Sequence, residues 1–200
     1  PLLPLNVQTS TPAIMTDEDS GPPLPSDSAS RGPRRGGAKR ERPLRVVRRP
    51  APTGDQWELV PSSCARRRQE DLREVEAMLE AGEIEIARDE LVWLLSECPD
   101  CVEAHLHLGL LALEDGDAKL ARGHFGRGVE LGLRALEEAG NPHPLPYALP
   151  GNQSFFESAK GLLHCLVATG RKALARDMSR RVVAFDPADP LALLRMAGEP

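Results

Sequence analysis

The sequence predicts an all-α protein, a solenoid of repeated helix pairs, and two observations carry this prediction. First, one residue pattern recurs at a fixed spacing: Gly82, Ala87, Leu91 and Pro99 are followed 34 positions later by Gly116, Ala121, Phe125 and Leu133, and after 20 extra residues by Gly170, Ala175, Ser179 and Pro187. Repeats of this length are typical of stacked helix pairs. Second, no segment alternates apolar and polar residues for long enough to predict a strand.

The first expected pair spans residues 68–101. In its second helix Ile84, Ala87, Leu91 and Leu94 recur at three- and four-residue steps, the period of an amphipathic helix. Its first helix is more polar. A terminal repeat has one face without a neighbour, so a polar first helix is expected at this end of an array.

The second expected pair, residues 102–135, carries the clearest motif. Leu108 and Gly109 are followed by Ala112, then by Ala121 and Phe125. We expect Gly109 and Ala121 to be small because the two helices cross closely there. The pattern resembles the tetratricopeptide repeat, which has a Leu-Gly pair in its first helix and a small residue followed by a bulky one in its second. This resemblance implies three such repeats.

Turn signals separate the expected helices. Gly116 suits the left-handed end of one helix, and Asp117 can cap the next. After the second pair no proline stops the helix, so we expect it to extend until Gly140. A proline-rich insertion is then predicted over residues 140–153, and glycines between 123 and 132 are expected to form a face for close helix approach.

The third expected pair spans residues 156–189. Ser154 and Glu157 match a capping box, which predicts that a helix restarts at Phe155. The apolar run at residues 191–196 is too short for another repeat. We expect it to form a short capping helix over the last apolar face.

Residues 1–60 are predicted to be a disordered tail ahead of a repeat domain at residues 61–200. The tail is rich in Pro, Arg and Gly and has no helical period, so it cannot bury enough apolar surface to fold. Met15 is a plausible natural start of the chain. Between Arg31 and Pro50 there are nine Arg or Lys against one acidic residue, whereas residues from Pro61 onward carry 16 basic and 23 acidic residues.

The compartment is predicted to be cytoplasmic, since no apolar run is long enough to span a bilayer and no secretion signal is recognisable. Reduced thiols are expected for the four cysteines in that case. Cys98, Cys101 and His105 have ligand-like spacing, but a fourth ligand is missing nearby and they fall at a turn between repeats. We therefore predict no metal and no other cofactor.

The resemblance to tetratricopeptide domains implies that the first helix of each pair lines a concave groove. The lining would combine apolar residues with several carboxylates: Gln69, Leu72, Glu76, Leu79 and Glu80 from the first pair, Glu103, Leu106, Leu110, Leu113 and Glu114 from the second, and Glu157, Lys160, His164 and Val167 from the third. For Leu106 and Leu110, packing against the next helix is an equally good interpretation. Such a groove suits a peptide with basic and apolar residues.

The predicted function is therefore a non-enzymatic protein–protein interaction module. Histidines and serines are scattered, and no phosphate-binding glycine loop follows a strand, so the sequence indicates no catalytic site. The alternative is a nucleic-acid-associated adaptor whose Arg-rich tail contacts the phosphate backbone. Aromatic residues that could stack on bases are missing from the basic run, which weakens this alternative. A further hypothesis is that the basic tail occupies the acidic groove until a partner displaces it.

Overall fold

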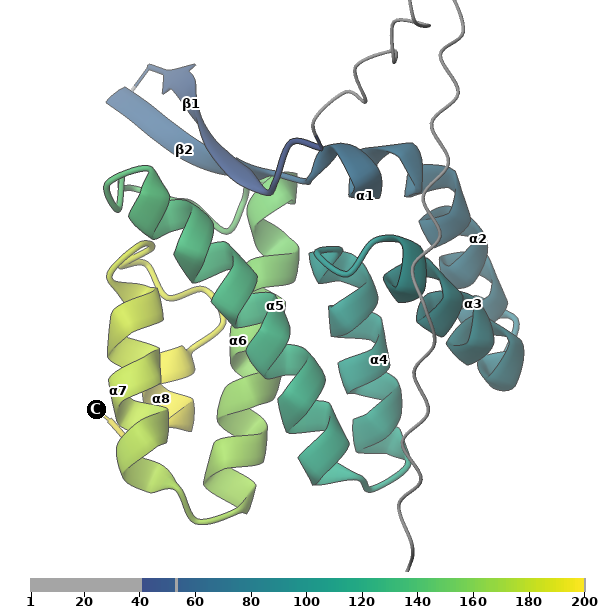
Figure 1. Cartoon of the computed structure of the whole chain (residues 1–200). Helices are drawn as coiled ribbons and strands as arrows, with labels where there is room; N and C mark the ends of the chain where they lie inside the picture. Colours follow the sequence, from purple (N-terminus) through teal and green to yellow (C-terminus); the bar gives the residue numbers. More distant parts are fainter. Residues whose placement is uncertain (1–40, 53, 200) are drawn as a thin grey trace, which may run out of the picture. The chain divides into compact units, whose positions relative to one another are not determined.

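A computed structural model describes residues 41–52 and 54–199. These residues form two strands, β1 (Arg45–Ala51) and β2 (Gly54–Val60), followed by eight helices (Figure 1). The helices are α1 (Ser63–Arg67), α2 (Gln69–Glu80), α3 (Ile84–Glu97), α4 (Val102–Glu114), α5 (Ala118–Glu138), α6 (Pro150–Ala168), α7 (Lys172–Val183) and α8 (Leu193–Met196). Residues 1–40 of the tail predicted over residues 1–60, including Met15, lie outside the described residues.

Three helix pairs, α2–α3, α4–α5 and α6–α7, are joined by turns of the same geometry. Gly82, Gly116 and Gly170 have φ angles of 77°, 76° and 74°, a left-handed conformation that glycine adopts without steric cost. In each turn the residue after the glycine donates its N–H to a carbonyl five residues earlier, at 2.8–2.9 Å. This is the Schellman arrangement, which satisfies carbonyls at a helix end. Asp117 also caps α5, as predicted.

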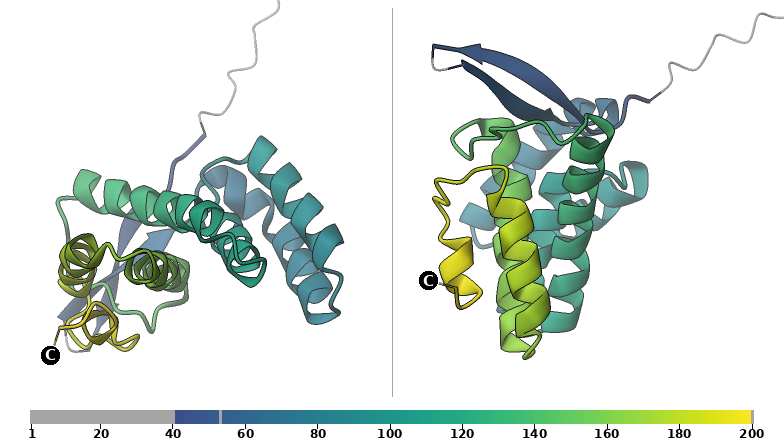
Figure 2. Two further views of the ribbon diagram at one scale, coloured as in Figure 1. Left: turned by 90° about the horizontal axis from the view of Figure 1, so that it is seen from below. Right: turned by 90° about the vertical axis from the view of Figure 1, so that its left-hand side faces the viewer.

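Neighbouring pairs pack side by side in chain order (Figure 2). The buried side chains form two clusters, one across α2, α3 and α4 and the other across α4 to α8 together with the strands. Helix α4 contributes to both clusters, because Leu108 and Leu111 belong to the first and Ala112 to the second. α4 therefore joins the first helix pair to the rest of the fold.

Close helix contacts explain some of the glycines but not all of them. A Cβ on Gly109 would lie 2.6 Å from the Phe125 ring, and one on Gly132 would lie 2.2 Å from the Phe155 ring. At Gly123 and Gly126 an added Cβ meets nothing within 4 Å. The expectation of a single glycine face is thus wrong for those two positions, which lie on the open side of α5.

The expectation that no strand forms is wrong, and part of the predicted tail belongs to the fold. β1 and β2 pair antiparallel from Arg45 opposite Val60 to Ala51 opposite Gly54. Two basic residues of the predicted tail have acidic partners within this hairpin, Arg48 with Asp55 at 3.1 Å and Arg49 with Glu58 at 2.6 Å. The seven residues of β1, RVVRRPA, do not alternate between apolar and polar, so the sequence carries no strand period there.

The hairpin is anchored to the helices by a buried amide. Asn152 of α6, which is fully buried, accepts a hydrogen bond from the Leu59 N–H at 2.8 Å. Its amide nitrogen donates to the carbonyls of Trp57 at 3.0 Å and Pro146 at 2.8 Å. Leu59 and Leu44 are buried in the same cluster as α5 and α6. The hairpin is therefore part of the core.

The last pair differs from the prediction at its start. Helix α6 begins at Pro150, so the predicted insertion over residues 140–153 ends earlier and Ser154 lies inside the helix. Proline favours the first turn of a helix because its N–H would be unpaired there, which accounts for the earlier start. Glu157 does not form a capping box. Its carboxylate accepts a hydrogen bond from the Tyr147 hydroxyl at 2.8 Å.

The predicted short helix near the C-terminus is present as α8. The Asp189 carboxylate accepts hydrogen bonds from the N–H groups of Leu193 at 2.7 Å and Leu194 at 3.1 Å. Leu193 is buried, and α8 contacts α6 and α7. The mostly helical character of the prediction is confirmed, with the hairpin as its exception.

Candidate interaction surface

The surface expected to bind a partner is best developed on α4. Glu103, Leu106, Leu110, Leu113 and Glu114 recur at helical spacing and share one face of this helix. Leu110 is 45% exposed, whereas Leu106 and Leu113 are half-buried and pack against the core. Of the two interpretations for Leu106 and Leu110, packing therefore holds for Leu106 and exposure for Leu110.

The expected α2 residues recur at helical spacing and share one face of this helix. Glu76 and Glu80 are exposed, and Leu79 is half-buried against the first cluster. The Glu76 Oε1 atom lies 3.9 Å from Nε2 of His107 on α4. Leu72 is buried, with 8% of its surface exposed, and belongs to the first cluster. Its apolar side chain gains more from burial against α3 and α4 than from exposure.

The α6 residues are partly engaged with their own neighbours. Glu157 pairs with Lys160 at 3.4 Å in addition to its bond with Tyr147. Val167 packs against the core, and His164 is exposed. α6 therefore offers one half-exposed cation, one exposed imidazole and a carboxylate that already has two partners.

Glu103 has the most unusual electrostatic environment on α4. It lines a small pocket of about 160 Å³ between α1, α2 and α4, together with Ala65, Arg66 and Leu72. Burial raises the pKa of the Glu103 carboxyl above its usual range, and the charge of Glu76 raises it further, although hydrogen bonds from its own backbone N–H and from the Cys101 thiol oppose the shift. A cation placed beside Glu103 would offset this cost of burial.

Five residues on α2 and α4 thus combine exposed carboxylates, a desolvated carboxyl group and an exposed leucine. We call Glu76, Glu80, Glu103, Leu110 and Glu114 the acidic face. Among the residues described, no ion pair is formed by Glu80 or Glu114. These two carboxylates are therefore available to an external cation.

The residues considered as metal ligands have other partners. Cys98 and Cys101 are buried, and the Cys101 thiol donates to the Glu103 carboxylate at 3.7 Å. Both ring nitrogens of His105 are engaged, Nδ1 with Nδ1 of His124 at 3.2 Å and Nε2 with the Pro99 carbonyl at 3.1 Å. Within residues 41–52 and 54–199, no three His, Cys, Asp or Glu side chains are grouped so that they could hold a metal ion.

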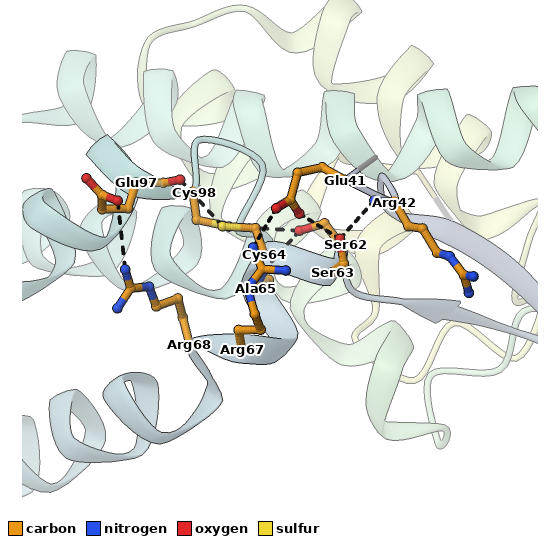
Figure 3. Close-up of polar contacts among 10 residues, drawn as sticks. All are labelled: Glu41, Arg42, Ser62, Ser63, Cys64, Ala65, Arg67, Arg68, Glu97 and Cys98. Carbon is orange, nitrogen blue, oxygen red and sulfur yellow. Dashed lines mark hydrogen bonds and ion pairs between the residues drawn. The ribbon is translucent and has the colours of Figure 1, made fainter. Parts of the chain in front are cut away.

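Sequence reasoning missed a pair of thiols. Cys64 of α1 and Cys98 at the end of α3 lie beside each other, because the Cys64 thiol donates to the carbonyl of Glu97, the residue before Cys98, at 3.4 Å (Figure 3). The two cysteines are 34 positions apart, the repeat interval. Equivalent positions of consecutive repeats lie next to each other in a stacked array, so this spacing could have indicated the pair.

The resemblance to tetratricopeptide repeats is supported by the sequence of this chain alone. No protein-family model, no curated protein and no solved structure matches this chain. Within the described ranges, no helix combines the length and the apolar character needed to cross a membrane.

Proposed function

We propose that the chain is a non-enzymatic interaction module whose acidic face binds a peptide with basic and apolar residues. The three helix pairs are taken as tetratricopeptide-like repeats, with α2, α4 and α6 as the partner-facing helices. The observation that carries the proposal is Leu110, a 45% exposed leucine with the carboxylates of Glu103 and Glu114 on the same face of α4. An exposed apolar residue beside unpaired charges is typical of a helix or strand recognition surface.

Charge complementarity decides the kind of partner. The acidic face presents four carboxylates. Arg66 of α1 lines the pocket of Glu103, and His107 of α4 lies 3.9 Å from Glu76, with its pKa lowered by burial although Glu76 opposes the shift. An acidic partner would be repelled by this surface. A lysine- or arginine-containing peptide would replace water around Glu103 with a direct ion pair, which is worth more where the carboxyl group is already desolvated.

The nucleic-acid alternative gains no support from the described part of the basic run. Arg48 and Arg49 are paired with acidic residues of the hairpin and are held at its surface by the strand register. The hairpin also limits which tail residues could occupy the acidic groove. Residues 45–60 belong to the hairpin, so only basic residues before Arg42 remain as candidates for that contact.

A labelled peptide of alternating lysine and leucine tests the proposal, with a glutamate–leucine peptide as the probe of charge. We expect the first peptide to bind in fluorescence polarisation and the second not to bind. The double variant Leu110→Ser with Glu114→Gln is expected to weaken binding about tenfold or more, because it removes an apolar anchor and a charge.

A matched double variant on another helix provides the control. Leu174→Ser with Asp177→Asn changes an exposed leucine and an acidic residue on α7, away from the acidic face. Its affinity should equal that of the unmodified chain. An equal loss in both double variants, or equal binding of the two peptides, would contradict the proposal.

Glu103 should make the affinity of this surface for the lysine–leucine peptide depend on pH. Because the pKa of its carboxyl is raised by burial, the negative charge that attracts a cation is lost at a higher pH than for an ordinary glutamate. Binding of the lysine–leucine peptide should therefore weaken as pH falls from neutral, and Glu103→Gln should flatten this dependence. A pH dependence that is unchanged in Glu103→Gln would show that this carboxyl does not contact the peptide.

A further inference from the structure

One pocket in the described part of the chain lies away from the acidic face. It has a volume of about 660 Å³ and is formed by the segment Glu41–Pro43, by α1 and by the turn between α3 and α4. Cys64 and Cys98 line it, together with basic and acidic side chains. The segment at Glu41 is held in place because the Ser63 hydroxyl donates to the Glu41 carboxylate at 2.6 Å and accepts from the Arg42 N–H at 2.8 Å.

The two thiols meet at the wall of this pocket (Figure 3). The Cys64 Sγ donates to the Glu97 carbonyl oxygen at 3.4 Å, so it lies against the peptide group that carries Cys98. The Cys98 Sγ is 3.9 Å from the Ser62 hydroxyl, two residues before Cys64. Both thiols are free. Two reduced thiols that line the same pocket and reach each other's neighbouring residues form an oxidisable dithiol.

The accessibility of the two thiols differs. Cys64 is half-buried, whereas Cys98 is only 2% exposed. Cys101 and Cys165 are completely buried, and neither lines this pocket. A reagent that enters the pocket would therefore find Cys64 more accessible than Cys98.

The charges around the thiols are mixed. Arg67 pairs with Glu41 at 2.5 Å, and Arg68 lies 3.8 Å from Glu97 and stacks over the Trp93 ring at 4.6 Å. Asp100, which pairs with Arg127 at 2.9 Å, adds a further carboxylate to the lining. Guanidinium groups bind carboxylates in pairs of hydrogen bonds, and the carboxylates of the pocket can pair with an ammonium group. This combination suits a small zwitterion that carries both kinds of group.

We propose that this pocket is a thiol–disulfide exchange site for a small zwitterionic disulfide of the glutathione class. The Cys64 thiolate attacks one sulfur of the disulfide, whose S–S bond breaks, and the first glutathione leaves and takes up the proton released by Cys64. The Cys98 thiolate then attacks the Cys64 sulfur of the mixed disulfide and expels the second glutathione, which takes up the Cys98 proton. Two protein thiols are oxidised to one disulfide while one glutathione disulfide is reduced to two glutathiones.

The second step depends on pH. Burial, the neighbouring Cys64 thiol and the charge of Asp100 raise the pKa of Cys98 to about 12, while the hydrogen bond with Ser62 opposes the shift. Only a small fraction of Cys98 is thiolate at neutral pH, and this fraction grows about tenfold per pH unit below the pKa. The mixed disulfide at Cys64 should accumulate near neutral pH and convert to the protein disulfide faster as the solution becomes alkaline.

The Cys64–Cys98 disulfide would link the two ends of the segment that contains the first helix pair. A bond between Cys64 and Cys98 closes a loop that contains α2 and α3, whose buried side chains form a cluster separate from that of α5 to α8. Closing such a loop restricts the unfolded chain and so favours the folded pair. Oxidation should therefore slow proteolysis within α2 and α3.

Intact-mass and peptide mass spectrometry of the full chain treated with glutathione disulfide tests the proposal, with free thiols blocked afterwards by alkylation. The unmodified chain should lose the mass of two hydrogen atoms and yield a Cys64–Cys98 cross-linked peptide. Cys98→Ser should stop at one glutathione adduct on Cys64, and Cys64→Ser should give neither product. Cys101→Ser, a buried thiol outside the pocket, should behave as the unmodified chain.

Three outcomes would overturn the proposal: four thiols that remain reduced, a stable glutathione adduct in the unmodified chain at alkaline pH, or oxidation that persists in Cys64→Ser.

The role of the charges is tested with Arg67→Gln against the control Arg66→Gln, whose side chain lies outside this pocket. Arg67→Gln should slow the first step by about threefold for glutathione disulfide and leave the rate with the uncharged disulfide of mercaptoethanol unchanged. Equal rates in the two arginine variants would contradict recognition of the zwitterion.

Discussion

His105 of α4 and His124 of α5 illustrate how single residues acquire properties that their sequence positions do not indicate. The Pro99 carbonyl can only accept a hydrogen bond, so Nε2 of His105 carries a hydrogen and Nδ1 of neutral His105 accepts from His124. Burial lowers the pKa of both imidazoles below the ordinary value of 6.5, and it lowers the pKa of His107 as well. For His105 the nearby His124 and Arg127 lower the pKa further, while Pro99 and Asp100 oppose the shift.

These histidines predict a loss of stability in acid. The unfolded chain binds protons at the ordinary pKa and the folded chain only at a lower pH, so the free energy of unfolding falls as pH drops through and below 6.5. Between about pH 7.5 and about pH 5.5, we expect the melting temperature to fall by about 5 °C. The triple variant His105→Gln, His107→Gln, His124→Gln should show a smaller fall.

The exposed His164 provides the control for that measurement. His164→Gln changes an imidazole on α6 without removing any of the three buried rings. Its melting temperature should follow the same dependence on pH as that of the unmodified chain. If the triple variant lost as much stability in acid as the His164 variant, the three buried histidines would not be the cause.

At the scale of helices, glycines and one aromatic ring set the distance between elements. Phe125 of α5 lies between Gly109 of α4 and Gly161 of α6, where an added Cβ would approach its ring to 2.6 Å and 2.5 Å. Three helices can therefore pack around one side chain only because two of them lack side chains there. Gly128 is similarly close to Ser158, whose buried hydroxyl has no hydrogen-bond partner among the described residues.

Alanine substitutions in α5 should change the free energy of unfolding in opposite directions at glycines that contact another helix and at glycines that face solvent. Gly123→Ala and Gly126→Ala should each raise the free energy of unfolding by about 1 kcal/mol, because alanine favours a helix and the added Cβ meets no neighbour within 4 Å. Gly132→Ala should lower it by about 1 to 3 kcal/mol, because its Cβ would overlap the Phe155 ring. Denaturant titration measures all three, and a destabilised Gly126→Ala would show that this side of α5 is not open.

At the scale of the folded unit from Glu41 to Glu199, the hairpin and the helices form one structure. β1 contacts α5, β2 contacts α6, and the Trp57 N–H donates to the Pro144 carbonyl at 3.0 Å. Asn152 connects β2, the loop before α6 and α6 itself through three hydrogen bonds. A buried amide with all its polar atoms engaged stabilises a specific arrangement, since leaving any of its partners unpaired is costly.

Removal of the Asn152 amide should therefore destabilise the whole unit. Asn152→Ala leaves the Leu59 N–H and two carbonyls without a partner and should lower the free energy of unfolding by about 2 to 3 kcal/mol. Gln153→Ala, an exposed neighbour on α6, is the control and should have little effect. Equal stability of the two variants in denaturant titration would mean that the hairpin is not held by this residue.

Local patterns in the sequence determined the helix pairs and their turns. The period of α3, the Leu108–Gly109 motif of α4 and the glycines at positions 82, 116 and 170 are local features of the sequence, so they can be recognised without knowing the fold. The acidic character of α2 and α4 was readable for the same reason. The choice between Leu106 as a packed residue and Leu110 as an exposed one needed the position of the neighbouring helices.

Only the tertiary structure decided the contacts between residues far apart in the chain. The hairpin depends on Leu59 meeting Asn152, 93 positions later, and its two short strands carry no pattern that predicts this contact. The dithiol depends on α1 lying beside the end of α3, and the histidine pair on α4 lying beside α5. Each of these arises because burial of apolar helix faces brings distant polar groups together, and the hydrogen bonds they form are a consequence of that packing.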